Sequence, residues 1–218
     1  MGSILVNDVD SCLILLCSMN AQSNSKTPPR MIIFAGTSGA GKNTIINELL
    51  KRCPTMKKLI TATTREMRPG EREGVDHYFI SKEEFQSHIH ENNVAEYVHF
   101  DERDVYYGSI KDQLEQQLGE PGVILAEVQL IGARYFKKHY NALTIFIEPE
   151  SLDVLERRIR ARSSLDEYEI KNRLAIAEHE IEHEAPFYDM RIANRDGELP
   201  QTIDRLMMIF EELGIQCV

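Results

Sequence analysis

Residues 36–44 read GTSGAGKNT, a G-x-x-x-x-G-K loop that directly follows the apolar run Met31–Ala35. The next stretch ends at Cys53-Pro54 and places four apolar residues on one helical face: Ile45, Ile46, Leu49 and Leu50. A buried strand, a glycine-rich turn and a helix N-terminus together direct backbone N–H groups and a positive helix dipole at phosphate oxygens. The sequence therefore predicts a phosphate-binding loop. A glycine-rich turn that binds nothing would leave the strand–loop–helix order unexplained.

The whole loop is expected to hold the phosphates of ATP: Gly36, Thr37, Ser38, Gly39, Ala40, Gly41, Lys42, Asn43 and Thr44. Lys42 is the residue expected to reach the β- and γ-phosphates, which makes it a catalytic candidate. Asn43 occupies the position where this motif usually carries Ser or Thr, whose hydroxyl binds Mg²⁺. The motif therefore predicts the nucleotide cradle but leaves the metal geometry open.

Composition bounds the class of protein and its partners. The chain has 218 residues, of which 42% are hydrophobic and 28% charged, as in an ordinary soluble globular domain. The net charge of -10 argues against a nucleic-acid polymer as partner, because no excess of cations exists to follow a phosphate backbone. The four cysteines show no metal-binding or C-x-x-C spacing: Cys12, Cys17, Cys53 and Cys217. We expect reduced thiols in a cytoplasmic protein.

Residues 1–30 form an N-terminal extension. Its apolar segment Cys12–Cys17 is too short to span a bilayer, and two aspartates precede it where a secretory signal would carry positive charge. Residues Ala21–Arg30 are polar, contain two prolines and are typical of a linker. We expect no membrane association. The extension either packs on the domain, or translation starts at Met19 or Met31.

Strand-like and helical patterns alternate through most of the chain. The strand-like runs are Met31–Ala35, Val123–Val128, Thr144–Ile147 and Arg191–Ala193. The helical patterns toward the C-terminus are Ser151–Arg160, a second that starts at a capping box formed by Ser164 and Glu167, and a third from Pro200 to Gly214. This alternation predicts an α/β fold in which a parallel P-loop-type sheet has helices on both faces.

The segment 59–110 interrupts the alternation and predicts a small mixed β/α insertion. It contains four short strand candidates, Leu59–Thr63, Tyr78–Ile80, Val94–Phe100 and Val105–Gly108, and one helix that starts at Ser81. The expected division is a core of residues 31–58, 111–156 and 174–218, an insertion that binds the phosphate acceptor, and a lid of residues 157–173.

Within the insertion, residues 61–71 read TATTREMRPGE and carry Arg65 and Arg68 three positions apart among hydroxyl groups. Two guanidinium groups at this spacing can bind the oxygens of one phosphate. An isolated pair of this kind would usually be a solvated charged loop. Its position about twenty residues after the phosphate loop, in an acidic protein, favours a second phosphate site.

In their order along the chain, these motifs resemble those of the guanylate kinase family. The shared features are the P-loop, T-T-R-x-x-R-P-G-E, an aromatic residue near G-x-D, an acidic base-binding residue, Y-Y-G-S and an arginine-rich lid, over roughly residues 31–213. The resemblance implies the reaction ATP + GMP ⇌ ADP + GDP with Mg²⁺, with dGMP as a further acceptor.

The resemblance also implies roles for individual residues. The GMP site would comprise Thr61, Arg65, Arg68, Glu71, His77, Tyr78, Glu96, Tyr107, Ser109 and Gln129. Within this set, Arg65, Arg68 and Tyr107 would hold the GMP phosphate. Glu96 would accept hydrogen bonds from guanine N1 and N2, and Thr61 and Ser109 would contact O6 and its surroundings.

The lid arginines Arg158, Arg162 and Arg173 would reach the transferring phosphoryl group, and Asn194 would lie near the adenine of ATP. Cations that close over the site have a physical reason, because phosphoryl transfer needs charge that meets the equatorial oxygens.

Three departures from the family pattern leave alternatives open. His77 stands where the family has tyrosine, so either His77 replaces the phosphate contact or Tyr78 moves into its place. The D-x-D-x-Q-G stretch of the family appears as AEVQLIG, so Glu127 and Gln129 can be aligned in more than one way. We expect Glu127 near Mg²⁺, together with Asn43, whose amide is the third departure.

Two other functions compete with GMP phosphorylation. One is a non-catalytic guanylate-kinase-like module that binds a phosphopeptide, which the intact Lys42 and lid arginines argue against. The other is a P-loop kinase for another small phosphorylated acceptor. A zinc protease is not expected although His179–His183 fits H-E-x-x-H, because both histidines lie opposite the apolar face of their helix.

Overall fold

A computed structural model describes residues 27–162 and 165–217 of the chain. The apolar segment Cys12–Cys17 and the possible start at Met19 lie outside these residues. The central strand, β1 (Met31–Gly36), is buried on both sides, and its neighbours are β7 (Val123–Glu127) and β8 (Leu143–Pro149). All three strands are parallel, so their carboxyl ends meet at one edge of the sheet.

The core sheet has five parallel strands in the order β2-β7-β1-β8-β9. The outer strands are β2 (Met56–Lys58) and β9 (Met190–Asn194). The predicted α/β core is confirmed, and each of its four expected strands is present. The strand β2 was not predicted from the sequence, because a three-residue strand with two exposed lysines has no recognisable apolar run.

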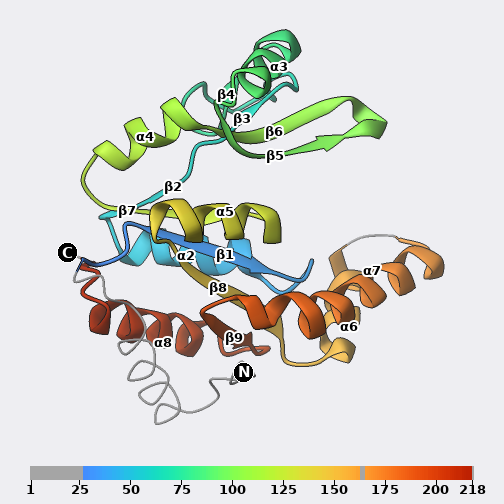
Figure 1. Cartoon of the computed structure of the whole chain (residues 1–218). Coiled ribbons are helices and arrows are strands. Elements are labelled where there is room, and N and C mark those ends of the chain that lie inside the picture. The colour runs from blue at the N-terminus through green and yellow to red at the C-terminus, as the bar shows by residue number, and fades with distance from the viewer. Residues whose placement is uncertain (1–26, 163–164, 218) are drawn as a thin grey trace.

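Helices cover both faces of the core sheet (Figure 1). On one face, α2 (Lys42–Arg52) and α8 (Leu199–Glu212) pack against alternate β1 residues such as Phe34. On the other, α4 (Lys111–Gly119) and α5 (Leu130–Tyr140) pack against the intervening residues such as Ile33. The period-2 alternation of a strand thus divides one continuous apolar run between two cores.

Two further helices, α6 (Leu152–Arg162) and α7 (Glu167–His179), pack against each other beyond the carboxyl end of β8. After α7 the chain continues as a π-helical turn, η2 (Glu180–Glu184), and a 3₁₀ turn, η3 (Ala185–Phe187). The capping box of α7 is formed by Asp166 and Glu169, not by Ser164 and Glu167 as predicted. Asp166 has the extended backbone of an N-cap, and its carboxylate accepts the Glu169 N–H at 2.8 Å.

The insertion is a separate mixed sheet in the order β4-β3-β6-β5. Its elements are β3 (Ala62–Thr63), β4 (Tyr78–Phe79), α3 (Lys82–His90), β5 (Val94–Phe100), the 3₁₀ turn η1 (Asp101–Arg103) and β6 (Val105–Ile110). As predicted, Ser81 caps α3 by accepting the Glu84 N–H. The antiparallel β5–β6 hairpin projects above the core toward the end of the molecule that carries α7 (Figure 1).

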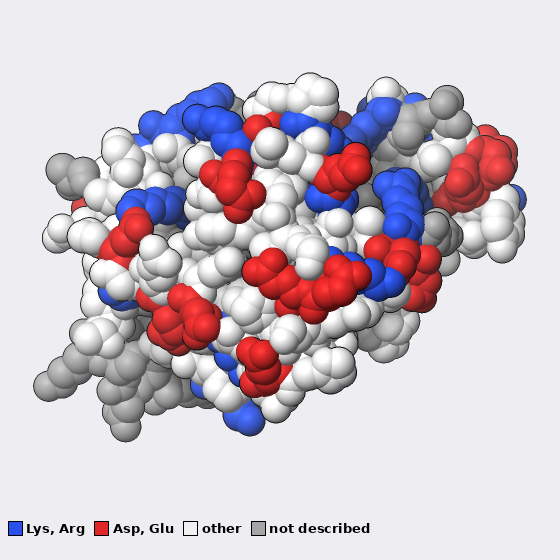
Figure 2. Space-filling model, turned by 90° about the horizontal axis from the view of Figure 1, so that it is seen from above, with Lys and Arg blue, Asp and Glu red and all other residues white. Residues whose placement is uncertain are grey.

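The surface is rich in acidic groups, as the net charge of -10 requires. On the face seen from above, Asp and Glu form several clusters, with Lys and Arg in separate groups between and around them (Figure 2). Among the helices of the described ranges, none combines the length and the apolar character needed to cross a bilayer.

A disulfide joins Cys53, at the end of α2, to Cys217 near the C-terminus, with their Cα atoms 4.4 Å apart. The expectation of four reduced thiols is therefore wrong for this pair, and Cys12 and Cys17 lie outside the described residues. The two partners are 164 residues apart, so their meeting follows from the packing of α8 beside α2 and not from any local spacing.

Reduction of this disulfide is expected to lower the free energy of unfolding by about 2–5 kcal/mol, because the unfolded chain regains the entropy of a long closed loop. Urea titrations with and without dithiothreitol measure the difference. Cys217→Ser should match the reduced wild type and should not respond to the reductant. Identical wild-type midpoints under both conditions would contradict the prediction.

Candidate functional site

The loop between β1 and α2 is shaped by glycines that have no room for a side chain. At Gly36, φ is +138° and an added Cβ would lie 1.9 Å from the carbonyl oxygen of Ile147. At Gly41, φ is +94° and a Cβ would lie 2.3 Å from the Asn194 amide nitrogen. The loop therefore lies directly against β8 and β9, at the edge where the parallel strands end.

Asn194 contacts the backbone of the phosphate loop from the end of β9. It is buried at the end of β9, and its side-chain nitrogen donates to the Ala40 carbonyl at 2.7 Å. Its contact with the loop backbone gives Asn194 a structural role that the sequence analysis, which placed it near adenine, did not anticipate.

Lys42 is the first residue of α2 and is largely buried in the loop. Its ammonium group donates to the carbonyl oxygens of Gly36 at 2.7 Å and Thr37 at 3.0 Å, and it lies 3.4 Å from Glu127. All of these partners sit at the carboxyl ends of β1 and β7. The lysine is thus held at the mouth of the loop, where the backbone N–H groups of an anion-binding turn converge.

Arg158 extends from α6 toward the same loop. Its guanidinium forms a two-nitrogen ion pair with Asp196, at 2.6 and 2.8 Å, and donates to the Asn194 carbonyl at 2.8 Å. The role of Asp196 was not predicted from the sequence, because no motif links it to Arg158, which lies 38 positions earlier in the chain. Arg158 and Arg162 both line a cavity beside the P-loop. Arg173 is exposed on α7 and does not line this cavity.

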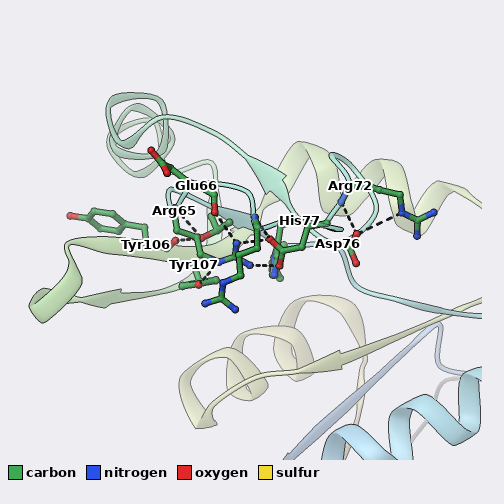
Figure 3. A network of polar contacts seen from close by, with 11 residues as sticks. Arg65, Glu66, Arg72, Asp76, His77, Tyr106 and Tyr107 are labelled. Atoms are coloured by element: carbon green, nitrogen blue, oxygen red, sulfur yellow. Dashed lines mark hydrogen bonds and ion pairs between the residues drawn. The ribbon is translucent and has the colours of Figure 1, made fainter.

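Arg65 is fixed in the insertion by two partners (Figure 3). Glu71 binds both terminal guanidinium nitrogens at 2.6 Å, and the Tyr107 hydroxyl accepts from Nε at 2.9 Å. The same carboxylate accepts the Arg68 backbone N–H at 2.8 Å. These contacts raise the pKa of Arg65, and they lower the pKa of Glu71 to about 2, chiefly through the Arg65 hydrogen bonds. Glu71 therefore orients the Arg65 side chain and holds the backbone at Arg68.

His77, and not Tyr78, lies beside this cluster. The His77 ring is 5.8 Å from the Tyr107 ring, and its Nδ1 is 3.1 Å from the Thr61 hydroxyl. Tyr78 instead packs in the small core of the insertion with Phe85. This placement favours His77 over Tyr78 as the counterpart of the family tyrosine. Burial and then the charge of Arg65 lower the pKa of His77, which favours the neutral imidazole.

Glu96 lies on β5 opposite Ser109 of β6, and the Ser109 hydroxyl donates to its carboxylate at 2.8 Å. Burial raises the pKa of Glu96, and the Ser109 hydrogen bond opposes this shift only in part. A partly buried carboxylate with spare acceptor positions, in the wall of a cavity, can bind a ligand that offers N–H donors.

Two cavities meet at the P-loop. One, of about 700 Å³, contains Asn43, Thr44, Arg158 and Arg162 in its walls. The other, of about 960 Å³, is lined by six of the predicted acceptor residues: Thr61, Arg65, Arg68, Glu96, Tyr107 and Gln129. Ser38, Lys42 and Glu127 line both cavities. Lys42 therefore lies between two cavities, one lined by Arg65 and Arg68 and the other by Arg158 and Arg162.

The large cavity has walls that the motifs did not predict. Glu180, Glu184 and Tyr188 approach it from the segment after α7, and Val98, Phe100 and Arg103 approach it from the β5–β6 hairpin. Burial, and then the neighbouring Glu184, raise the pKa of Glu180. Alternation along β5 could have indicated Val98 and Phe100, because both are two-residue steps from Glu96.

The side chains near Lys42 fit a magnesium ion. Glu127 offers a partly exposed carboxylate, and Asn43 and Thr44 line the same cavity with an amide and a hydroxyl oxygen. Mg²⁺ in such sites takes one or two protein oxygens and completes its shell with phosphate and water.

The H-E-x-x-H stretch has no features of a zinc site. His179 and His183 are exposed, their rings stack 4.5 Å apart, and the described residues contain no group of three side chains suited to a metal ion.

Comparison with known proteins decides the family. The sequence model of the family described as guanylate kinase matches residues 28–213. The chain belongs to the guanylate kinase family. A guanylate kinase of Synechocystis is 37% identical over 88% of this chain and 98% of its own length, and one of Thermosynechococcus vestitus is 40% identical over 81% and 91%.

A solved structure agrees with this assignment. The guanylate kinase of Anaplasma phagocytophilum superposes with a TM-score of 0.58 at 25% identity, over 85% of this chain and 86% of the other. As an enzyme of this family, the chain is a nucleoside monophosphate kinase.

Glu96→Gln is expected to raise the free energy of unfolding at pH 8. Folding raises the pKa of Glu96 above its ordinary value of about 4.5, so the buried charge destabilises the native state as pH rises through the folded pKa. The gain should shrink at acid pH, where the wild-type carboxyl is protonated. Urea titrations at pH 4 and 8 measure it. Glu66→Gln, at an exposed position nearby, is the control and should change little. A Glu96→Gln protein less stable than the wild type at pH 8 would contradict the prediction.

Proposed function

We propose that this protein transfers the γ-phosphoryl group of ATP to GMP, giving ADP and GDP. The observation that carries the proposal is that two cavities, each lined by arginines, meet at Lys42, with the partly buried carboxylate of Glu96 in one of them. Family membership supports the same reaction. We further propose a cytoplasmic location, where ATP is the ready phosphoryl donor and where reducing conditions would open the Cys53–Cys217 bond.

The donor would bind in the P-loop cavity. In the structure Lys42 donates to the carbonyl oxygens of Gly36 and Thr37. Phosphate oxygens carry more charge than carbonyl oxygens, so Lys42 would move its hydrogen bonds to the β- and γ-phosphates when ATP enters. Arg158 and Arg162 line the same cavity and would approach the phosphate chain, with Arg173 joining them if the lid closes.

The acceptor would bind between the insertion and the core. Arg65, already oriented by Glu71 and Tyr107, and Arg68 would hold the GMP phosphate. Because Arg65 has its partners before the ligand arrives, it gives up less conformational entropy on binding. His77 would contribute through its contact with Thr61, and Gln129 would face the nucleotide from the start of α5.

Base selection would rest on Glu96. Its carboxylate already accepts from Ser109 and retains further acceptor positions for guanine N1–H and N2–H. Adenine has no donor at either place, so AMP would cover the carboxylate and leave it only the Ser109 hydrogen bond, at a cost of several kcal/mol when both guanine bonds are lost.

The chemical step would be a direct in-line transfer. An oxygen of the GMP phosphate attacks the γ-phosphorus, the bond from that phosphorus to the bridging oxygen breaks, and ADP leaves with the bonding electrons. Above a pH of about 6 the acceptor phosphate is a dianion, so no side chain needs to remove a proton. The protein's part is to align the two phosphates and to surround the transferring group with Lys42 and the arginines. Mg²⁺, held by Glu127 and Asn43, would neutralise phosphate charge when bound.

The expected preference is at least about a hundredfold in kcat/KM for GMP and dGMP over AMP. Coupled ADP-release assays with GMP, dGMP, AMP, CMP, UMP and ribose phosphates measure it and also test for a different acceptor. Glu96→Gln should reduce the preference without changing the KM for ATP, because Glu96 lines only the large cavity and not the P-loop cavity where ATP would bind. Glu66→Gln serves as the exposed control. Equal use of AMP and GMP by the wild type would refute the assignment of Glu96.

Lys42→Ala is expected to reduce kcat to less than about a tenth of the wild-type value, because the lysine meets charge that grows on the β–γ bridge. The mutation should leave thermal unfolding nearly unchanged. Lys51→Ala, at an exposed position in the last turn of the same helix, is the matched control and should retain full activity. A Lys42→Ala enzyme with near-normal kcat would remove the P-loop from the mechanism.

A further inference from the structure

The β5–β6 hairpin has two different faces. Glu96, Val98 and Phe100 of β5, with Val105 and Tyr107 of β6, line the large cavity. The intervening residues Tyr97, His99 and Tyr106 line a shallow pocket on the opposite side. This division follows from the alternation of side chains along a strand. The hairpin therefore presents one continuous face to the bound nucleotide.

Positions along that face are ordered relative to the acceptor. Glu96 pairs with Ser109 at the base-binding level, Val98 pairs with Tyr107 at the level of the phosphate cluster, and Phe100 pairs with Val105 further out. At about 3.3 Å per residue, Phe100 lies about 13 Å along the strand from Glu96. The turn of the hairpin thus lies beyond the acceptor phosphate, on the side away from the base.

Arg103 is the last residue of the 3₁₀ turn η1 at the end of this hairpin. It lines the cavity that also contains Lys42, Ser38 and Arg65. Arg65 and Arg158 are both engaged by carboxylates, but among the described side chains none forms an ion pair with Arg103. An exposed arginine in the wall of this cavity, with no ion pair to another described side chain, is suited to bind phosphate oxygens.

The turn that carries Arg103 is held in shape by neighbouring side chains. His99 lies between two carboxylates, with Nδ1 2.8 Å from Asp101 and Nε2 3.0 Å from Asp104, and its ring stacks on Tyr106 at 4.1 Å. Asp104 has a φ of +51° and also pairs with Lys82 of α3. These contacts fix both ends of the 3₁₀ turn, so Arg103 projects from a braced loop.

We propose that Arg103 is a further catalytic residue, which contacts the transferring phosphoryl group from the acceptor side of the site. The proposal rests on the proposed function and adds a cation that no family motif indicates. The lid arginines Arg158 and Arg162 approach from α6, whereas Arg103 approaches from the insertion. Charge that develops on the equatorial oxygens would then be met from two sides. His99 is a positioning residue that holds the turn.

Single-turnover rapid-quench measurements with enzyme in excess over ATP test the proposal, because they report the transfer step apart from product release. Arg103→Ala should slow transfer tenfold or more and change the KM for GMP less than about threefold, and Arg103→Lys should restore part of the rate. Arg72→Ala is the matched control. Arg72 is an exposed arginine of the same insertion that pairs with Asp76, away from the Arg65–Tyr107 cluster (Figure 3).

A binding measurement gives a readout without turnover. The probe is an analogue in which one polyphosphate chain links adenosine to guanosine, so that it spans both cavities. Arg103→Ala should weaken this analogue about tenfold or more by calorimetry and leave the affinity for GMP alone within about threefold. Equal losses for both ligands would place Arg103 in ordinary acceptor binding and would overturn the proposal.

His99→Ala tests the bracing of the turn through a double-mutant cycle. In the wild type it should slow transfer, whereas in the Arg103→Ala background it should have little further effect. Additive losses would show that His99 acts on stability and not through Arg103.

These outcomes distinguish a failure of the Arg103 proposal from a failure of the proposed function. A wild-type enzyme that transfers phosphoryl to GMP, with an Arg103→Ala rate within threefold of it, would overturn this inference and leave the proposed function intact. A wild type without GMP-dependent turnover would overturn the proposed function, and the role of Arg103 would fall with it.

Discussion

The close approach of Gly36 to the Ile147 carbonyl is the constraint on which the rest of the site depends. A side chain at Gly36 would collide with β8, and one at Gly41 would collide with Asn194. The loop can therefore lie at the carboxyl edge of the sheet only with these glycines. That position brings Lys42 to Glu127 and places the start of α2 where both cavities open. A parallel sheet makes this possible, because its strands all end at the same edge.

Carboxylates arrange the cations of this acidic protein. Glu71 holds Arg65, and Asp196 holds Arg158, each through two guanidinium nitrogens. Two hydrogen bonds to one carboxylate restrain the plane of an arginine, so the side chain loses little further freedom when phosphate arrives. The overall charge of -10 therefore does not prevent anion binding, because the local geometry concentrates the cations around the cavities.

The two faces of the β5–β6 hairpin differ in their packing and polarity. Its inner face carries Glu96, and burial raises the pKa of this carboxyl above its ordinary value. Its outer face is stabilised by the stacked rings of His99, Tyr106 and Phe85. A well-packed outer face allows the inner face to keep polar groups that remain incompletely paired without nucleotide.

The sequence by itself determined the P-loop, the parallel core, the T-T-R-x-x-R-P-G-E turn and the family, because these features depend on local periodicity and on residues close together in the chain. It did not determine where His77 and Tyr78 lie relative to the Arg65–Tyr107 cluster. Only the pairing of β3, β4 and β6 places His77 beside Tyr107 and Tyr78 in the small core. The Cys53–Cys217 bond, the Asp196–Arg158 pair and the position of Arg103 over the cavity were likewise decided by tertiary structure. Each of these contacts joins residues that are far apart in the sequence, and periodicity along the chain does not predict contacts of that kind.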